Sequence, residues 1–293
     1  HVVISGRNAA TNAAALAQLQ ALGSGQVQAL TSTQLNNLNT TQLAGLTSGQ
    51  VQNLSSSQLN ALTSVKLQAL ETGDVKALSS TQIQSLSSTQ LNNLSTSQVK
   101  ALSTDQMRAL GTAQLNRLSS TTVQTLESTQ INALTSTQVG GLTAAGVFNK
   151  LSTAQVEVLS SDVLRAASTS AIQGVGTVQL NALGSSQIQA LTSSQVQALS
   201  STQLNNVETG QVKNLSSAQV QALTSSQLNV MTSTALQALD TVDVQAIGTV
   251  VMQSLNSNAL NGLASTQIQA LTSTQLKALT TAQLNALGSS AIQ

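Results

Sequence analysis

The sequence contains no proline, cysteine, tryptophan or tyrosine, and its only phenylalanine is Phe148. The absence of cysteine excludes disulfide bonds and thiolate metal sites. Because aromatic rings contribute the largest buried areas, their near absence requires a thin core built from aliphatic side chains. A single large globular core is therefore not expected for these 293 residues.

Charge is also scarce in this chain. Ten Lys and Arg residues against nine Asp and Glu residues give a net charge of +1, and 6% of the residues are charged. A protein that binds nucleic acid needs a basic surface to neutralise phosphates, so we expect no nucleic-acid partner. No apolar run approaches the roughly 20 residues of a membrane-spanning helix, so we expect no such segment.

Histidine occurs only at His1, at the start of the sequence. No histidine-containing triad or metal cluster can therefore be assembled, and we expect neither catalysis nor a bound metal or cofactor. Because the sequence opens with "HVVISG" and not with Met, we interpret it as a segment of a longer chain.

An eight-residue unit repeats along almost the whole chain. We label its positions a to h, with Leu at a, Thr or Ser at b, Gln at e and Leu, Val or Ile at f. Of 35 units, 24 carry Gln at e. Position a recurs every eighth residue from Leu22 to Leu142 and restarts one residue late at Leu151. The sequence thus divides into a lead-in (1–13), a first array (14–142), a register-shifted unit (143–150) and a second array (151–293).

Each octad contains the signals of a helix start. Thr or Ser at b followed by Gln at e forms the capping box [ST]-x-x-[EQ], and the aliphatic residues at a and f occupy the positions of a hydrophobic staple. A continuous helix is excluded because eight residues would rotate the leucine stripe by about 80° per unit. The spacing predicts an all-α solenoid with one short capped helix per octad, with a and f inside and b, c and g outside. The number of units per turn stays open.

A β-solenoid is the alternative, because Thr, Val and Ile favour strands and many surface repeats are β-helices. Positions a, f and h do not alternate with the period of two that a half-buried strand requires. Leu, Gln and Ala, which favour helices, dominate from e to the next a. The helical interpretation is therefore preferred.

Few side chains offer chemistry, and each has a simple structural interpretation. Gly146 and Phe148 lie in the register-shifted unit, where the ring either lines a ligand pocket or fills the volume at a packing defect. The acidic residues are interpreted as helix caps and a solvated face: Asp74, Asp105, Asp162, Asp240 and Asp243. The basic residues that share position g are interpreted as solubilising: Lys76, Lys100, Arg108, Lys213 and Lys277.

Units such as "TSTQLKAL" and "TAQLNALG" resemble the [TS]-x-x-Q-[LVI]-x-A-L octads of very large secreted or surface-exposed bacterial repeat proteins, often described as adhesin-like or haemagglutinin-like. The resemblance covers residues 14–293 and implies an extracellular structural role. Units that lack Gln at e depart from the pattern, so their capping is expected to be incomplete: Val163, Ala171, Ala235, Val251 and Ala259.

The sequence therefore predicts a non-enzymatic structural repeat protein. We expect a self-associating subunit or segment of an extracellular fibre, filament or cell-surface stalk, with further copies of itself as partners, because little net charge keeps copies apart. The alternative is an adhesin or binding module whose uncharged Thr, Ser, Gln and Asn rows contact a glycan or ice.

Overall fold

A computed structural model describes residues 9–287 of the protein, with side chains from Ala13 onward. Within that range the chain forms 34 α-helices and no strand. The predicted α-solenoid of short capped helices is confirmed, and the β-solenoid alternative is wrong. The hydrogen-bonding side chains at b and e select the helix, although β-branched residues are frequent in each octad.

The chain divides into two compact units, the first ending at Gln138 and the second beginning at Val139. The first unit holds α1 Ala9–Gln20, α2 Ser24–Gln28, α3 Ser32–Asn37, α4 Thr40–Ala44, α5 Ser48–Gln52, α6 Ser56–Ala61, α7 Ser64–Ala69, α8 Thr72–Ala77, α9 Ser80–Ser85, α10 Ser88–Asn93, α11 Thr96–Ala101, α12 Thr104–Ala109, α13 Thr112–Asn116, α14 Ser120–Thr125 and α15 Ser128–Asn132.

Helix α16, Ser136–Gly140, includes the boundary between the units. The second unit holds α17 Val147–Lys150, α18 Thr153–Glu157, α19 Ser161–Ala166, α20 Thr169–Gly174, α21 Thr177–Asn181, α22 Ser185–Ala190, α23 Ser193–Gln197, α24 Ser201–Asn206, α25 Thr209–Lys213, α26 Ser217–Ala222, α27 Ser225–Leu228, α28 Ser233–Gln237, α29 Thr241–Ala246, α30 Thr249–Gln253, α31 Ser257–Gly262, α32 Ser265–Gln269, α33 Ser273–Ala278 and α34 Thr281–Ala286.

Helix α12 shows how one octad folds. The Ser103 hydroxyl accepts a hydrogen bond from the Gln106 amide at 3.2 Å, and the Gln106 side-chain oxygen accepts from the Ser103 amide at 2.8 Å, which completes the capping box. The helix ends at Leu110, whose backbone is extended at φ −62° and ψ 135°. Such corners require no left-handed residue, and no described residue has a positive φ. Extended backbone at a and b thus turns the chain without proline or a glycine-specific turn.

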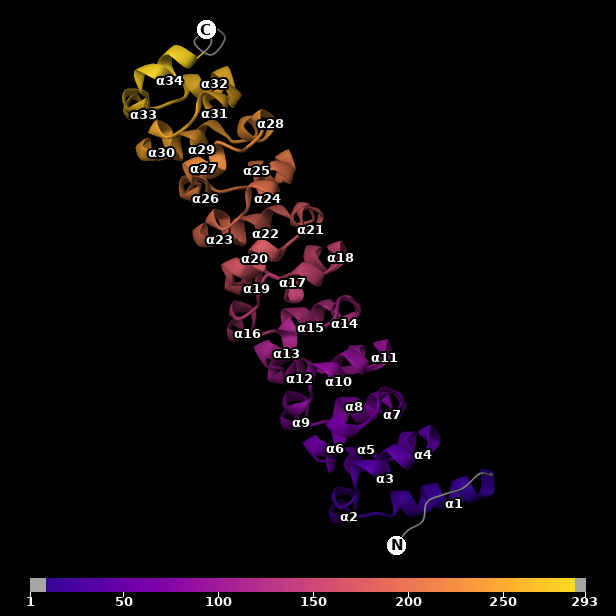
Figure 1. Cartoon of the computed structure of the whole chain (residues 1–293). Helices are drawn as coiled ribbons and strands as arrows, with labels where there is room; N and C mark the ends of the chain where they lie inside the picture. The colour runs from indigo at the N-terminus through magenta and orange to yellow at the C-terminus, as the bar shows by residue number, and fades with distance from the viewer. Residues whose placement is uncertain (1–8, 288–293) are drawn as a thin grey trace. The chain divides into compact units, whose positions relative to one another are not determined.

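Three octads make one turn of the solenoid. Helix α8 packs closely on α5 and on α11, and the same spacing of three helices recurs through both units (Figure 1 shows the successive turns). Residues at a and f point into the core of each turn: Leu110 is 4% exposed and Met107 is 0% exposed. Each turn of about 24 residues therefore presents one layer of aliphatic side chains to the next.

The first helix differs from the octads that follow. Helix α1 runs without interruption from Ala9 to Gln20, so the boundary that the sequence places between 13 and 14 falls inside it. In the octad that begins at residue 14, position b is Ala15, which has no side-chain oxygen to cap a new helix start. The backbone therefore continues as one longer helix, which packs on α4.

The register shift produces the longest stretch without a helix between consecutive described helices, residues 141–146. Helix α17 follows it and has only four residues. The Gly174 Cα lies so close to the preceding loop that an added Cβ would sit 2.6 Å from the carbonyl carbon of Ala144. The extra residue is thus absorbed in a loop that closely approaches a glycine on α20.

Candidate functional site

The dominant chemical feature of the solenoid is the buried glutamine at position e. Gln106 is 3% exposed, and its amide nitrogen donates to the carbonyls of Val75 at 2.9 Å, Lys76 at 3.2 Å and Leu78 at 2.8 Å. These carbonyls belong to the end of α8 and to the residue that follows it at a, one turn earlier. Helix C-termini leave such carbonyls without intrahelical partners. A single glutamine therefore caps the start of its own helix and the end of another.

This arrangement recurs through both units at constant offsets. In each case the amide nitrogen donates to carbonyls 31 and 28 residues earlier. The first unit contains these contacts at Gln50, Gln58, Gln82, Gln90, Gln98, Gln114, Gln130 and Gln138. The second unit contains them at Gln179, Gln187, Gln195, Gln203, Gln219, Gln227, Gln267, Gln275 and Gln283. We call these two sets, together with Gln106, the glutamine ladder.

In one octad without Gln at e, two other residues take over its contacts. Lys66 stands in that octad, and its ammonium group donates to the carbonyl of Leu38, 28 residues earlier. The amide of Thr63, which a glutamine would otherwise cap, donates at 3.0 Å to the side-chain oxygen of Asn36. Lys66 and Asn36, from two different octads, thus divide between them the two roles of one glutamine.

A similar asparagine serves other units without Gln. The Asn92 side-chain oxygen accepts from the Ser119 amide at 2.7 Å and from the Thr122 hydroxyl at 3.1 Å. The Asn229 side-chain oxygen accepts from the Asn256 amide at 2.8 Å. In each case an asparagine at g accepts from the N-cap amide 27 residues later, and the sequence interpretation missed this long-range capping. The same contact also occurs in two octads that keep Gln, where Asn60 accepts from the Ser87 amide and Asn181 from the Glu208 amide.

The departures from the repeat keep their helices. At Val163, Ala171 and Ala235 the backbone amide still donates to the hydroxyl of the residue at b, at 3.3, 2.9 and 3.2 Å. Ala259 donates in the same way to an asparagine at b. Val251 follows Gly248 at b, which offers no side chain, and helix α30 still forms. Losing Gln removes half of the capping box without changing the secondary structure.

Aspartate replaces Gln at e in two octads. Asp74 is 3% exposed and accepts from the Ser48 hydroxyl at 2.9 Å and from the Glu71 amide at 3.2 Å. Burial raises the pKa of Asp74, and the two hydrogen bonds partly oppose this rise. Asp243 is 6% exposed and accepts from the Ser217 hydroxyl at 2.7 Å. At these two positions the glutamine amide that would donate to the previous turn is thus replaced by a carboxyl group that accepts from a serine of that turn.

The remaining carboxylates lie on the surface. Asp105 and Asp162 form ion pairs with Arg108 and Arg165 at 3.2 and 3.6 Å, within their own helices. Asp240 is exposed at the start of α29, whereas Asp243 is buried. In the described part of the chain no group of three or more His, Asp or Glu residues could hold a metal ion. His1 lies outside the described residues.

The basic residues at g are exposed along the solenoid. Lys100 forms an ion pair with Glu127 at 3.1 Å, with about half of each side chain exposed. Exposed pairs of this kind contribute about 0–1 kcal/mol. Lys76 occupies the same repeat position as Lys100, three octads and therefore one turn earlier. Lys213 and Lys277 lie in the second unit. These side chains do not converge on a buried site.

Phe148 lies inside the core, 1% exposed, on α17. Counted back from Leu151, it occupies position f, and Gln179 donates to its carbonyl at 3.5 Å as at any other f. The cavity beside the ring is about 10 Å³ and is lined by aliphatic residues such as Ile172 and Leu180. That volume is about one water molecule, so the ring fills the core and leaves no room for a ligand. Gly146 precedes α17 at its N-cap.

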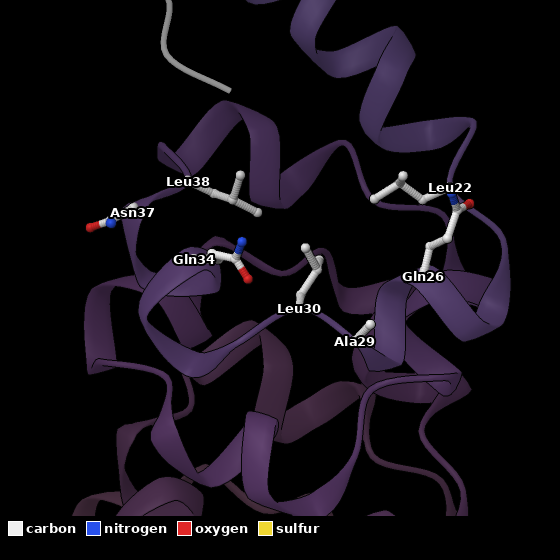
Figure 2. Close-up of a pocket in the computed structure, with 7 residues that line it drawn as sticks. All are labelled: Leu22, Gln26, Ala29, Leu30, Gln34, Asn37 and Leu38. Atoms are coloured by element: carbon white, nitrogen blue, oxygen red, sulfur yellow. The ribbon is translucent and has the colours of Figure 1, made fainter. Parts of the chain in front are cut away.

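A larger hollow of about 360 Å³ opens over α2 and α3 (Figure 2). Leu22, Leu30 and Leu38 line it with Gln26 and Gln34, and Figure 2 shows Gln34 between Leu30 and Leu38. The two glutamine oxygens accept from the cap amides at 2.9 and 2.8 Å, as elsewhere in the array. Their amide nitrogens donate to no described residue, unlike those of the glutamine ladder.

Five segments of the chain match the family model of the ALTTAQ repeat: residues 67–104, 91–120, 107–144, 176–209 and 204–241. A tandem repeat array is confirmed. The hexapeptide "ALTTAQ" itself occurs at 278–283, where it runs from position h to position e and includes the cap and the ladder glutamine. No curated protein matches the chain. Among the described residues, none of the helices has the length and apolarity of a membrane span.

Proposed function

We propose that this chain is a non-enzymatic structural protein of the cell exterior, a subunit or segment of a fibre, filament or surface stalk that associates with copies of itself. The repeat array and the helical solenoid support a repeat-based structural role. The observation that carries the proposal is the glutamine ladder, which joins most octads of each unit to the turn before them through the same hydrogen bonds. A surface built from identical turns can be extended by adding further turns.

The composition of the outer surface also supports this role. Position d is exposed in every octad from Thr33 to Thr137, and most of these residues are small and uncharged. With 6% charged residues and a net charge of +1, copies repel one another only weakly. The extracellular location follows from the resemblance to surface-exposed repeat proteins and is part of the proposal.

Sedimentation velocity of the purified chain over a wide concentration range tests self-association. We expect a sedimentation coefficient that rises with concentration, and filaments in negative-stain images at the highest concentration. A monomer throughout the range would refute the self-association. Antibody labelling of intact source cells tests the location, and labelling only after permeabilisation would refute it.

A surface-binding module is the second candidate, and the exposed rows at d favour it. Successive turns place these residues in columns, because three octads make one turn. Regular hydroxyl columns suit contact with a glycan or with ice. Retention on a glycan array or inhibition of ice growth by a monomeric chain would favour this candidate over the fibre.

A further inference from the structure

We propose that an open hollow on the first unit, lined by residues of α8, α11, α12 and α15, binds an acidic saccharide, with a hexuronate carboxylate on the Lys76 ammonium group. The hollow has a volume of about 450 Å³, and all of its lining residues lie in the first unit. Small-molecule sites occupy about 300–1,000 Å³. The proposal does not depend on self-association, and it gives the surface-binding candidate a ligand class and a place.

Gly73 leaves room in the hollow on the side of α8. It occupies position d, where most octads of the first unit carry a side chain. A Cβ added at Gly73 would meet no other part of the chain within 4 Å. The other lining residues include the corner Leu102–Ser103 between α11 and α12 and Glu127 at the N-cap of α15. Residues from three successive turns therefore contribute to one hollow.

Lys76 brings to the hollow a positive charge that has no partner in the described part of the chain. The other charged residues of the lining, Lys100 and Glu127, form an ion pair with each other at 3.1 Å. Lys76 forms no ion pair or hydrogen bond with any of residues 9–287. The repeat explains the difference, because Glu127 follows Lys100 by 27 residues, whereas Ser103 follows Lys76 at the same offset. Two lysines and one glutamate thus leave one ammonium group for an anion.

Hydroxyl groups line the same hollow and indicate a polyhydroxylated anion. Thr72, Thr104 and Thr129 are exposed there, and their hydroxyls form no hydrogen bond with a described residue. A hydroxyl both donates and accepts, as the hydroxyls of a sugar ring do. The only aromatic ring of the chain, Phe148, is buried, so a sugar has no ring to stack on and a charged contact must hold it. Phosphate fits less well because its sites favour arginine forks, and no arginine lines the hollow.

A second octad with nearly the same letters supplies a matched control. Residues 71–76 read "ETGDVK" and residues 208–213 read "ETGQVK". Gly210, also at position d, likewise meets no other part of the chain within 4 Å. Asp240 follows Lys213 by 27 residues, at the place that Glu127 holds relative to Lys100. A carboxylate at this position repels a second carboxylate, so we expect the octad at 208–213 not to bind the ligand.

Isothermal titration calorimetry of the whole chain with trigalacturonate tests the site. We expect a Kd on the order of 1 mM or tighter, and no binding of the neutral methyl ester. Gly73→Gln fills the hollow and Lys76→Met removes its free charge, so each should weaken binding at least about fivefold. Gly210→Gln and Lys213→Met are the matched controls and should bind as the unaltered chain does. All of these positions are exposed helical residues, so far-UV circular dichroism should stay unchanged and the melting temperature should stay the same or rise slightly.

Absence of binding by the unaltered chain, or binding that persists in both Gly73→Gln and Lys76→Met, would overturn the site. Equal binding of the methyl ester would show that the carboxylate is not recognised, and equal binding of a triglutamate peptide would show that the sugar hydroxyls are not. Either result would overturn the assignment to an acidic saccharide. Sedimentation velocity of the same samples measures self-association separately, so failure of this site and failure of the proposed fibre are distinguishable.

Discussion

Replacing one ladder glutamine with methionine should destabilise the solenoid through two helices at once. Gln106→Met keeps a side chain of similar length but removes the acceptor for the Ser103 amide and the donor to the Val75 and Leu78 carbonyls. A typical hydrogen bond contributes about 1 kcal/mol, and a buried polar group left without a partner costs about 1–3 kcal/mol. We expect the free energy of unfolding to fall by about 3 kcal/mol.

Gln42→Met provides the matched control. Gln42 has the same capping box, with the Asn39 amide donating to its side-chain oxygen at 2.9 Å, but no described residue accepts a hydrogen bond from its amide nitrogen. Only the loss of a cap interaction is expected, about 1 kcal/mol. The difference between the two variants isolates the cross-turn hydrogen bonds.

Urea unfolding followed by circular dichroism measures both variants. Repeat proteins can unfold in parts, so native-state hydrogen exchange of α8 and α12 should accompany it. In Gln106→Met the amides of both helices should exchange faster, since one side chain serves both. Equal losses of stability in the two variants would show that the cross-turn bonds contribute nothing.

Three further predictions concern Asp74, Gly174 and Leu110. Asp74→Gln restores a cross-turn donor and should stabilise the chain by about 1–3 kcal/mol at pH 7. Because burial raises the Asp74 pKa, the unaltered chain should gain stability as pH falls through that pKa, and the variant should lose this gain. The same dependence of the free energy of unfolding on pH in both chains would contradict this. Gly174→Ala should lower the melting temperature by forcing the facing loop away, whereas Gly210→Ala, with open space around it, should leave it unchanged or raise it slightly. Leu110→Asp should cost about 4 kcal/mol and the exposed Thr121→Ala less than about 0.5 kcal/mol, and equal melting temperatures would show that inside and outside are misassigned.

The local structure could be predicted from the octad because its signals act within eight residues. The capping box at Ser103 and Gln106 and the burial of Leu110 depend on neighbours that the sequence places side by side. The stacking of three octads per turn could not be predicted, since it depends on the angle at each extended corner. The second contact of Gln106 was hidden for the same reason: its partners, Val75 and Leu78, are defined only once the turn is known.

The defect at Phe148 was only partly predictable. Its place in the register-shifted unit is visible in the sequence, but whether the extra residue falls before or after the ring is not. The structure places the extra residue in the loop before α17, so Phe148 occupies position f. The ring is therefore an ordinary core residue, and the close approach of the loop to Gly174 is what absorbs the shift.

The paired replacement of a glutamine by two residues from different octads has a consequence for how such an array can change in length. Recombination between near-identical octads adds or removes whole units, and a regular glutamine tolerates this because every octad offers the same carbonyls. The Asn36 and Lys66 pair does not, because the amide that Asn36 caps, that of Thr63, must lie 27 residues away. An octad gained or lost between them would leave Thr63 without its cap. Each asparagine cap of this kind therefore ties together two octads 27 residues apart, inside the ladder as well as outside it: the Ser87 amide depends in the same way on Asn60.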